Sequence, residues 1–248
     1  SFDIILSANM LHDKLIKDLI MNRFRLYTWQ LTSILFCVSM TSCFEEEENE
    51  EMLEEEYFYE YVDLGLPSGL KWATMNVGAT KPEEYGGYYS WGEIEEKEHY
   101  SWSNGYKYDV SESSLLAINV VDSCGNLTYS HDAASMNWGG LWRTPTESEF
   151  KELIDHCDWN WTNLNGVNGY MVSSKEKDNK NSIFLPAGGI NVYPELVKLG
   201  EFGYYWCANT SDDYSLYSTT FQFNSDMKKL GRISLRYSGQ AVRPVAEY

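Results

Sequence analysis

Between residues 57 and 248 the apolar positions come in short runs separated by Gly, Asn, Asp and Pro, which is typical of short strands joined by turns. Tyrosine alternates with other residues over 57–61, and Pro67-Ser68-Gly69 lies between two apolar stretches within 62–72, so we expect a hairpin there. Further strands are expected over 88–91, 170–173, 182–185, 204–207, 219–223 and 233–237. Strand content should therefore exceed helix content.

One helix stands out, and a second, shorter one is expected. Over 143–156 Thr146 is followed three residues later by Glu149, which forms a capping box at a helix start. The side chains that recur at helical spacing, and should form its buried face, are Phe150, Leu153, Ile154 and Cys157. A shorter helix is expected over 132–137, ended by Gly139-Gly140. Scattered strands with one or two helices predict an α+β domain of many short antiparallel strands rather than a parallel doubly wound sheet.

Residues 21–42 have the pattern of an export signal. Two arginines precede an apolar run, which gives way to small residues just before Cys43. The run is shorter than the roughly 20 apolar residues that a transmembrane helix needs. Cys43 at its end resembles the lipobox of bacterial lipoproteins, in which this cysteine is lipidated and becomes the first mature residue, although Met40 stands where leucine is usual. An ordinary signal peptide or a buried helix are the alternatives.

An acidic segment follows the expected lipidation site. Residues 44–60 hold ten glutamates and no basic residue, and like charges at this density keep a chain extended, so 43–60 is read as a lipidated cysteine on an acidic tether. The segment resembles the acidic signal that directs Bacteroidetes-type lipoproteins to the outer leaflet of the outer membrane, which implies exposure at the cell surface. A simple spacer is the alternative. Residues 1–20 precede Met21 and are read as a mis-set start or a disordered extension.

The rest of the chain is moderately acidic and rich in aromatic residues. Residues 61–248 hold 15 basic and 24 acidic residues, a net charge of −9, within a total of −18. Nucleic-acid partners are therefore not expected, because they require a basic surface. With 19 Tyr and 9 Trp, the chain has rings both for a core and for a binding surface.

Seven segments resemble, in order along the chain, the Fibrobacter succinogenes major paralogous domain family, which is abundant in gut Bacteroidetes. They are YVDLGLPSGLKWATMNVGA (61–79), YGGYYSWGE (85–93), DAASMNWGGLWRTPTESEFKELID (132–155), NGVNGYMVSS (165–174), NSIFLPAGG (181–189), GYYWCANT (203–210) and SGQAVRPV (238–245). The resemblance implies that 61–248 is one C-type-lectin-like domain related to the sulfatase-modifying (formylglycine-generating) domain. It implies no established activity. Met75 and Cys207 stand where relatives often have Cys and Ser, so no disulfide scheme is carried over.

No set of residues predicts a catalytic centre. Sulfatase-modifying enzymes bind copper through a C-terminal cysteine pair, whereas no cysteine follows Cys207 here. Cys124, Cys157 and Cys207 lack C-x-x-C or histidine spacing for zinc, and are read as small buried hydrophobes with at most one disulfide, its pairing left open. No histidine has Ser-His-Asp spacing, and acidic residues are too many for a glycosidase pair to be recognised.

Two groups of residues are candidates for ligand binding. Trp159 and Trp161 alternate with polar residues in a turn-rich stretch and could present their rings to a sugar or a protein, the alternative being that they close over the core. Asn209, Asp212 and Asp213 form a polar cluster that could supply oxygens to Ca²⁺, although the lectin E-P-N and W-N-D signatures are missing and a solvated turn is simpler. No cofactor is otherwise expected. The tryptophans expected in the core are Trp91, Trp138, Trp142 and Trp206.

These observations favour a surface-exposed outer-membrane lipoprotein whose lectin-like domain recognises a glycan or an envelope or host protein. A non-catalytic structural or assembly component of the cell envelope is the second hypothesis. A carbohydrate-active or sulfatase-modifying-like enzyme is the third.

Overall fold

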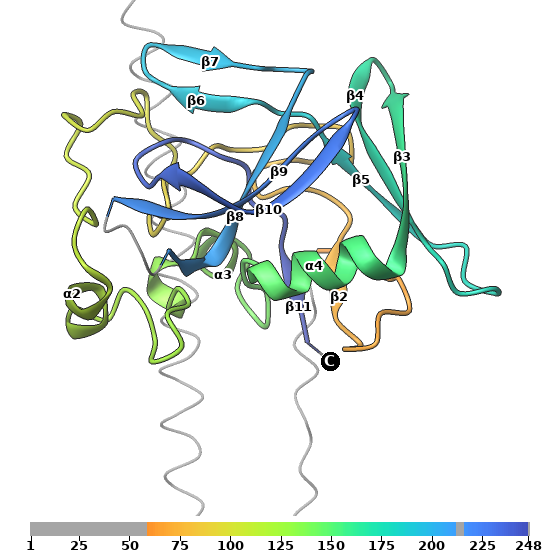
Figure 1. The fold of residues 1–248 in the computed structure, drawn as a ribbon, viewed down its shortest axis with the longest axis horizontal. Helices are drawn as coiled ribbons and strands as arrows, with labels where there is room; N and C mark the ends of the chain where they lie inside the picture. The colour runs from red at the N-terminus through yellow and green to blue at the C-terminus, as the bar shows by residue number, and fades with distance from the viewer. Residues whose placement is uncertain (1–58, 212–215, 248) are drawn as a thin grey trace, which may run out of the picture. The chain divides into compact units, whose positions relative to one another are not determined.

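Every pair of strands within the described sheets is antiparallel (Figure 1). The computed structural model describes residues 59–211 and 216–247, all within one compact unit, Glu54–Tyr248. The expected signal segment 21–42, Cys43 and most of the acidic tether lie outside the described residues.

The first sheet joins the two ends of the described chain. β1 (Tyr61–Asp63) pairs with β2 (Lys71–Ala73), and Gly69 N donates to Leu66 O at 2.9 Å in the turn between them, so the expected hairpin is confirmed. On its other side β2 pairs with β11 (Val245–Ala246). The last strand of the chain thus completes the sheet that the first hairpin begins.

The second sheet contains the Trp159 and Trp161 segment as a regular strand. β3 (Cys157–Leu164) pairs with β4 (Val167–Ser174), which pairs with β5 (Ser182–Pro186). The expectation of a turn-rich stretch at 159–166 is wrong, because only Asn165 and Gly166 form the turn, with φ of 50° and 92°. Positive φ at both central positions is what a two-residue hairpin with a type I′ turn requires, and Asn-Gly supplies it readily.

The third sheet has the order β10–β9–β8, and a separate hairpin precedes it. β8 (Gly203–Thr210), β9 (Tyr217–Asn224) and β10 (Met227–Leu235) form the sheet, and β6 (Ile190–Val192) pairs with β7 (Glu195–Val197). The structure confirms strands at 170–173, 182–185, 204–207 and 219–223, and at 233–235 within the expected 233–237. The strand expected over 88–91 is wrong, because only Tyr89 forms a bridge, with Gln240.

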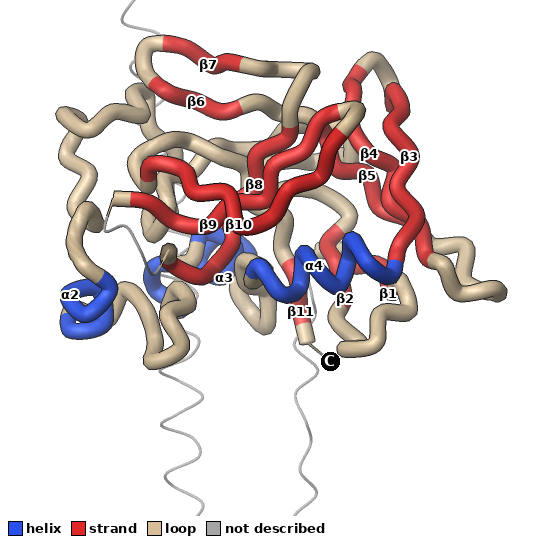
Figure 2. Tube along the Cα trace, in the orientation of Figure 1, coloured by secondary structure: helices blue, strands red, loops and turns tan. Residues whose placement is uncertain are grey.

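Helices are few (Figure 2). α4 (Glu147–His156) begins after Thr146 as expected and buries Phe150 and Leu153, while α3 (Ala133–Trp138) matches the expected shorter helix within one residue at each end. α2 (Glu112–Ala117) was not expected, because it buries Leu115 alone and has little apolar periodicity. A 3-10 turn covers Tyr129–His131. Mainly antiparallel strands with few helices confirm the α+β class.

Aromatic rings build the core. The Phe150 ring on α4 lies 4.8 Å from that of Phe221 on β9, which fixes the helix against the third sheet. Trp91, Trp142 and Trp206 are buried as expected, whereas Trp138 is only half-buried, stacked on Tyr59 at 3.8 Å. Most of the large rings are therefore committed to packing, and the exposed ones are the more informative for function.

Candidate binding groove

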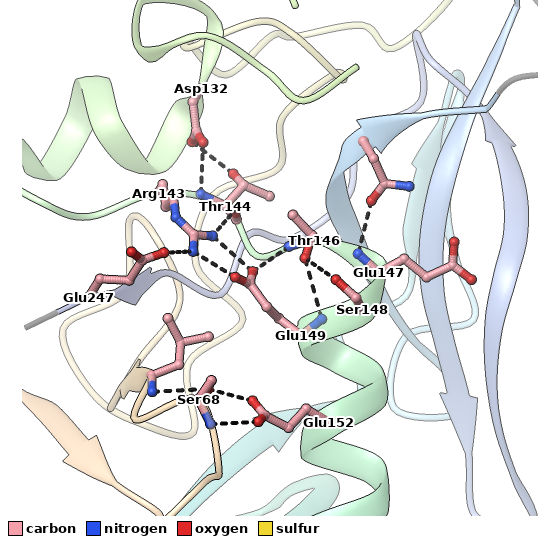
Figure 3. A network of polar contacts seen from close by, with 12 residues as sticks. Ser68, Asp132, Arg143, Thr144, Thr146, Glu147, Ser148, Glu149, Glu152 and Glu247 are labelled. Carbon is pink, nitrogen blue, oxygen red and sulfur yellow. Dashed lines mark hydrogen bonds and ion pairs between the residues drawn. The ribbon is translucent and has the colours of Figure 1, made fainter. Parts of the chain in front are cut away.

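The start of α4 is held by side chains that close its free N–H groups (Figure 3). Thr146 Oγ1 accepts from Glu149 N at 3.3 Å, and Glu149 Oε2 accepts from Thr146 N at 2.7 Å, which confirms the expected capping box. Asn209 Oδ1, from β8, accepts from Glu147 N at 2.9 Å. Because these donors are already satisfied, the helix start is a fixed scaffold and not an open anion site.

A bidentate ion pair fixes the residues before the helix. Arg143 Nη1 and Nη2 donate to the two oxygens of Glu149 at 2.8 and 2.6 Å, and Nη2 also donates to Glu247 at 2.6 Å. Burial alone would raise the pKa of Glu149, but the hydrogen bonds and charge of Arg143 and the Thr146 N–H outweigh burial and hold it below the usual value. The carboxylate of Glu149 is thus fully engaged in structure.

Asp132 connects the two helices from inside the core. Its carboxylate is buried, caps α3 by accepting from Ala134 N at 2.8 Å, and accepts from Thr144 N and Oγ1, both at 2.8 Å. Burial raises the pKa of Asp132, and the donors around it offset this only in part. The groups that donate to Asp132 are backbone N–H groups and the Thr144 hydroxyl, so this carboxylate serves to hold the structure together.

A groove of about 790 Å³ runs beside α4, and we call it the α4–β10 groove. Residues from the first to the last turn of α4 line it together with two residues of β10, and two asparagines from other segments contribute as well. Its lining residues are Asn126, Thr146, Glu147, Ser148, Lys151, Ile154, Asp155, Asn209, Lys228 and Leu230. Its volume falls in the usual range of small-ligand sites.

The groove combines neutral polar groups with a small apolar wall. Within the described residues the side-chain amide of Asn126 has no hydrogen-bond partner, so it can bind a ligand. Ile154 of α4 and Leu230 of β10 are half-buried and both line the groove. Lys151 pairs with Asp155 in the next turn of the helix. The amide, the hydroxyls and the apolar surface suit an uncharged polar ligand.

The two carboxylates in the lining are not placed as a glycosidase pair. Glu147 and Asp155 are eight residues apart on one helix, which separates them by about 12 Å along its axis. Retaining and inverting glycosidases hold their two carboxyl groups roughly 5 to 9.5 Å apart. The groove lining therefore lacks this arrangement.

Trp159 lies next to the groove but is tied to the core. Its Nε1 donates to Leu153 O at 3.2 Å, and its ring lies 5.7 Å from Phe221. Lys228, which lines the groove, holds its ammonium 5.7 Å from the Trp159 ring centroid and 4.9 Å from that of Tyr170. Trp159 thus supports the groove wall through Lys228.

Trp161 is also a cover for the core. It packs edge-on against Tyr170 at 5.2 Å and Phe223 at 6.3 Å. Both tryptophans are half-buried, and these contacts favour the interpretation that they close over the core rather than form a ligand platform. Only part of each ring remains exposed.

Of the expected calcium cluster, only Asn209 is described, and it caps α4 and donates to Thr219 at 3.3 Å. Asp212 and Asp213 lie outside the described residues. In residues 59–211 and 216–247 no three His, Cys, Asp or Glu side chains gather as a metal site. The side chain of Asn209 is therefore used in capping the helix.

The three cysteines of the domain are all free. Cys157 and Cys207 are buried as expected, and burial raises the pKa of Cys157 to about 11 and that of Cys207 well above its usual value, which keeps both thiols protonated and unreactive. The expectation that Cys124 is buried is wrong. It is exposed in the turn where its N–H donates to Asp122 Oδ1 at 2.8 Å.

Comparison with family models, with curated proteins and with solved structures finds no match for this chain. In the part of the chain that the structure describes, no helix is long and apolar enough to cross a membrane. The sequence reasoning found Asn209 in the groove but missed Asn126 and Lys228. Each is a single polar residue in its own segment, and no spacing could have shown that they meet.

Proposed function

We propose that this chain is a lipoprotein exposed on the outer membrane and that its C-type-lectin-like domain is a non-catalytic binding module for a glycan. The observation that carries the proposal is the α4–β10 groove, where the unpartnered amide of Asn126 and the hydroxyls of Thr146 and Ser148 line one space with Ile154 and Leu230. Sugars present hydroxyl groups and apolar C–H faces together, which this lining complements.

Charge supports an uncharged ligand. The groove contains two lysines and two carboxylates, and Lys151 is already paired with Asp155. The remaining pair, Glu147 and Lys228, leaves no net charge in the lining. An anionic polymer would gain little here, because the domain as a whole carries a net charge of −9 from 15 basic and 24 acidic residues.

A glycan array with the full chain in detergent tests the groove. Asn126→Ala should weaken binding of the best neutral glycan up to about tenfold, since a hydrogen bond contributes roughly 0.5 to 1.5 kcal/mol. Asn160→Ala, an identical change at an exposed position on β3 outside the groove, is the matched control and should leave binding unchanged. Binding that is equal in both variants would exclude the groove as the site.

The lipid anchor is tested separately. In cells fed a labelled fatty acid, the full chain should carry label and fractionate with the outer membrane, and Cys43→Ser should lose both properties. A Cys43→Ser chain that keeps the label would refute lipidation at this residue. Surface exposure is read by protease treatment of intact cells, which should degrade the wild-type chain.

A further inference from the structure

A second surface gathers exposed aromatic rings around one buried tyrosine, Tyr100. Its ring fills the space beside Gly239, where an added Cβ would lie 2.8 Å from ring atoms, and its carbonyl accepts from Tyr193 N at 3.1 Å. Gly239 and Asn191 exchange two backbone hydrogen bonds of 2.8 Å. The loop around residue 100, the β6–β7 hairpin and the turn after β10 are thereby fixed to one another, and Figure 1 shows the loop and the hairpin side by side.

Four rings from these three segments form what we call the ring platform: His99, Trp102, Tyr193 and Tyr237. His99 and Tyr193 meet edge-on at 4.4 Å, and Trp102 and Tyr237 meet at 5.8 Å. Trp102 is 47% exposed and Tyr193 is 51% exposed, whereas Trp91, Trp142 and Trp206 are at most 2% exposed. The core tryptophans are thus closed to water, whereas Trp102 and Tyr193 are in contact with it.

The backbone beneath the platform is well supported. Tyr100 OH accepts from Lys97 N at 3.0 Å and donates to Tyr88 O, and Asn104 Nδ2 donates to His99 O at 2.8 Å. Rings on a fixed backbone lose little conformational entropy on binding. In the same loop the hydroxyls of Ser101 and Ser103 hydrogen-bond to each other at 3.2 Å, which further fixes the loop.

Acidic residues flank the platform residues in the sequence. The segment before it, 93–98, holds four glutamates against Lys97, which is paired with Glu93, and Glu195 follows Tyr193 by two residues. This charge repels nucleic acids, sulfated or uronic polymers and anionic lipid. Charge complementarity thus leaves an uncharged or a basic partner.

The exposed area of the rings distinguishes between an uncharged partner and a basic one. A Trp or Tyr ring can bury about 150 to 250 Å², so two half-exposed rings offer on the order of 200 Å². A stable protein interface needs about 800 Å² from each partner. A few sugar units, whose C–H faces stack on rings, fit the smaller area.

We propose that the ring platform binds an uncharged polysaccharide chain, at a site separate from the α4–β10 groove. Trp102 and Tyr193 supply the stacking faces, while Tyr237 and His99 hold them in place edge-on. The two sites share no lining residue. The platform thus extends the proposed function, and it can exist whether or not the groove binds a ligand.

Affinity gel electrophoresis of the full chain in detergent tests this proposal, with β-glucan, xylan and galactomannan as neutral probes and alginate as the anionic one. At least one neutral polymer should retard the wild-type chain and alginate should not. Trp102→Ala and Tyr193→Ala should each weaken retardation about tenfold, the usual cost of deleting an aromatic anchor. Tyr129→Ala, which removes a tyrosine that is 57% exposed and outside the platform, is the matched control and should bind as the wild type does.

Three outcomes would overturn the platform: retardation by none of the neutral polymers, retardation by alginate alone, or equal retardation of the wild-type, Trp102→Ala and Tyr193→Ala chains. The far-ultraviolet circular dichroism of each variant verifies that it is folded. Asn126→Ala separates the two proposals. If it alone loses binding, the groove is the site and the platform is refuted, and if only the ring variants lose binding, the platform stands and the groove fails.

Discussion

Arg243 is a buried cation whose hydrogen-bond partners are neutral groups. Its Nε donates to Asn76 Oδ1 at 2.8 Å, and its two terminal nitrogens donate to Ala73 O at 2.9 Å and Phe184 O at 2.7 Å. Burial lowers the pKa of Arg243 to about 10, which still leaves it charged at neutral pH. The planar guanidinium of Arg243, with its forked set of N–H donors, thus joins β2, the segment after it and β5 at one point.

Replacing this fork should destabilise the domain. Arg243→Lys keeps a charge but cannot reach three acceptors in different directions, so we expect the free energy of unfolding to fall by about 2 to 4 kcal/mol. Urea unfolding followed by tryptophan fluorescence measures it. Arg232→Lys, at an exposed position on β10, should change the value by less than about 0.5 kcal/mol. Similar losses in both variants would mean that the buried fork is not the cause.

Glu149 should give the domain a stability that acid removes. Its pKa is lower in the folded chain than the ordinary 4.5, so its contribution is complete above that value and is lost as the pH falls through the folded pKa. Glu149→Gln should therefore cost about 2 kcal/mol at pH 7 and progressively less below pH 4.5. Urea titrations of both chains between pH 7 and pH 3 measure the difference. A cost that does not change with pH would show that the charge contributes nothing.

Single residues were the hardest part to predict. The capping pair Thr146 and Glu149 was found because its partners are three residues apart and always meet on a helix. Asn126 and the rings at 102 and 193 carry no such local relation. Their meeting depends on which loops the tertiary fold brings together, and a single sequence does not contain that information in any spacing.

At the scale of elements, α4 depends on how its start is capped. Thr146→Ala removes the hydroxyl that accepts from Glu149 N, and we expect a loss of about 1 kcal/mol. Thr146→Ser keeps the hydroxyl and should remain near the wild-type stability. Thermal unfolding of the two variants, measured side by side, tests the cap. An equally stable Thr146→Ala chain would indicate that the cap from Asn209 suffices.

Strands and helices were predicted where local chemistry decides them. The Pro67 to Gly69 turn and the apolar face of α4 are local signals, and the structure has both elements. The Asn165-Gly166 turn is an equally local signal, and it indicates that Trp159 lies on a strand before a hairpin turn. The strand predicted over 88–91 is absent for another reason. Gly86 and Gly92, with φ of 74° and 81°, interrupt the extended chain on either side of this segment.

At the scale of the whole molecule, the many buried tyrosines should limit stability in base. Burial raises the pKa of both Tyr100 and Tyr205 to about 12, above the ordinary 10. Between these values only the unfolded chain loses the proton, so stability is complete below pH 10 and falls as the pH rises, by about 1.4 kcal/mol per pH unit for each tyrosine.

Urea unfolding at pH 8, 10 and 11 measures how steeply the free energy of unfolding falls with pH. Tyr100→Phe should reduce this slope by the contribution of one tyrosine. The absorbance of ionised tyrosine at 295 nm should rise together with unfolding. If these tyrosines ionised while the circular dichroism stayed native, the burial argument would fail.

The closing of β2 between β1 and β11 has a consequence for how the chain matures. β11 lies far along the chain from β2, so β2 keeps one open edge until the segment containing β11 has been synthesised. The first sheet can therefore close only after most of the domain has been made, whereas the β3–β4 hairpin needs only neighbouring residues.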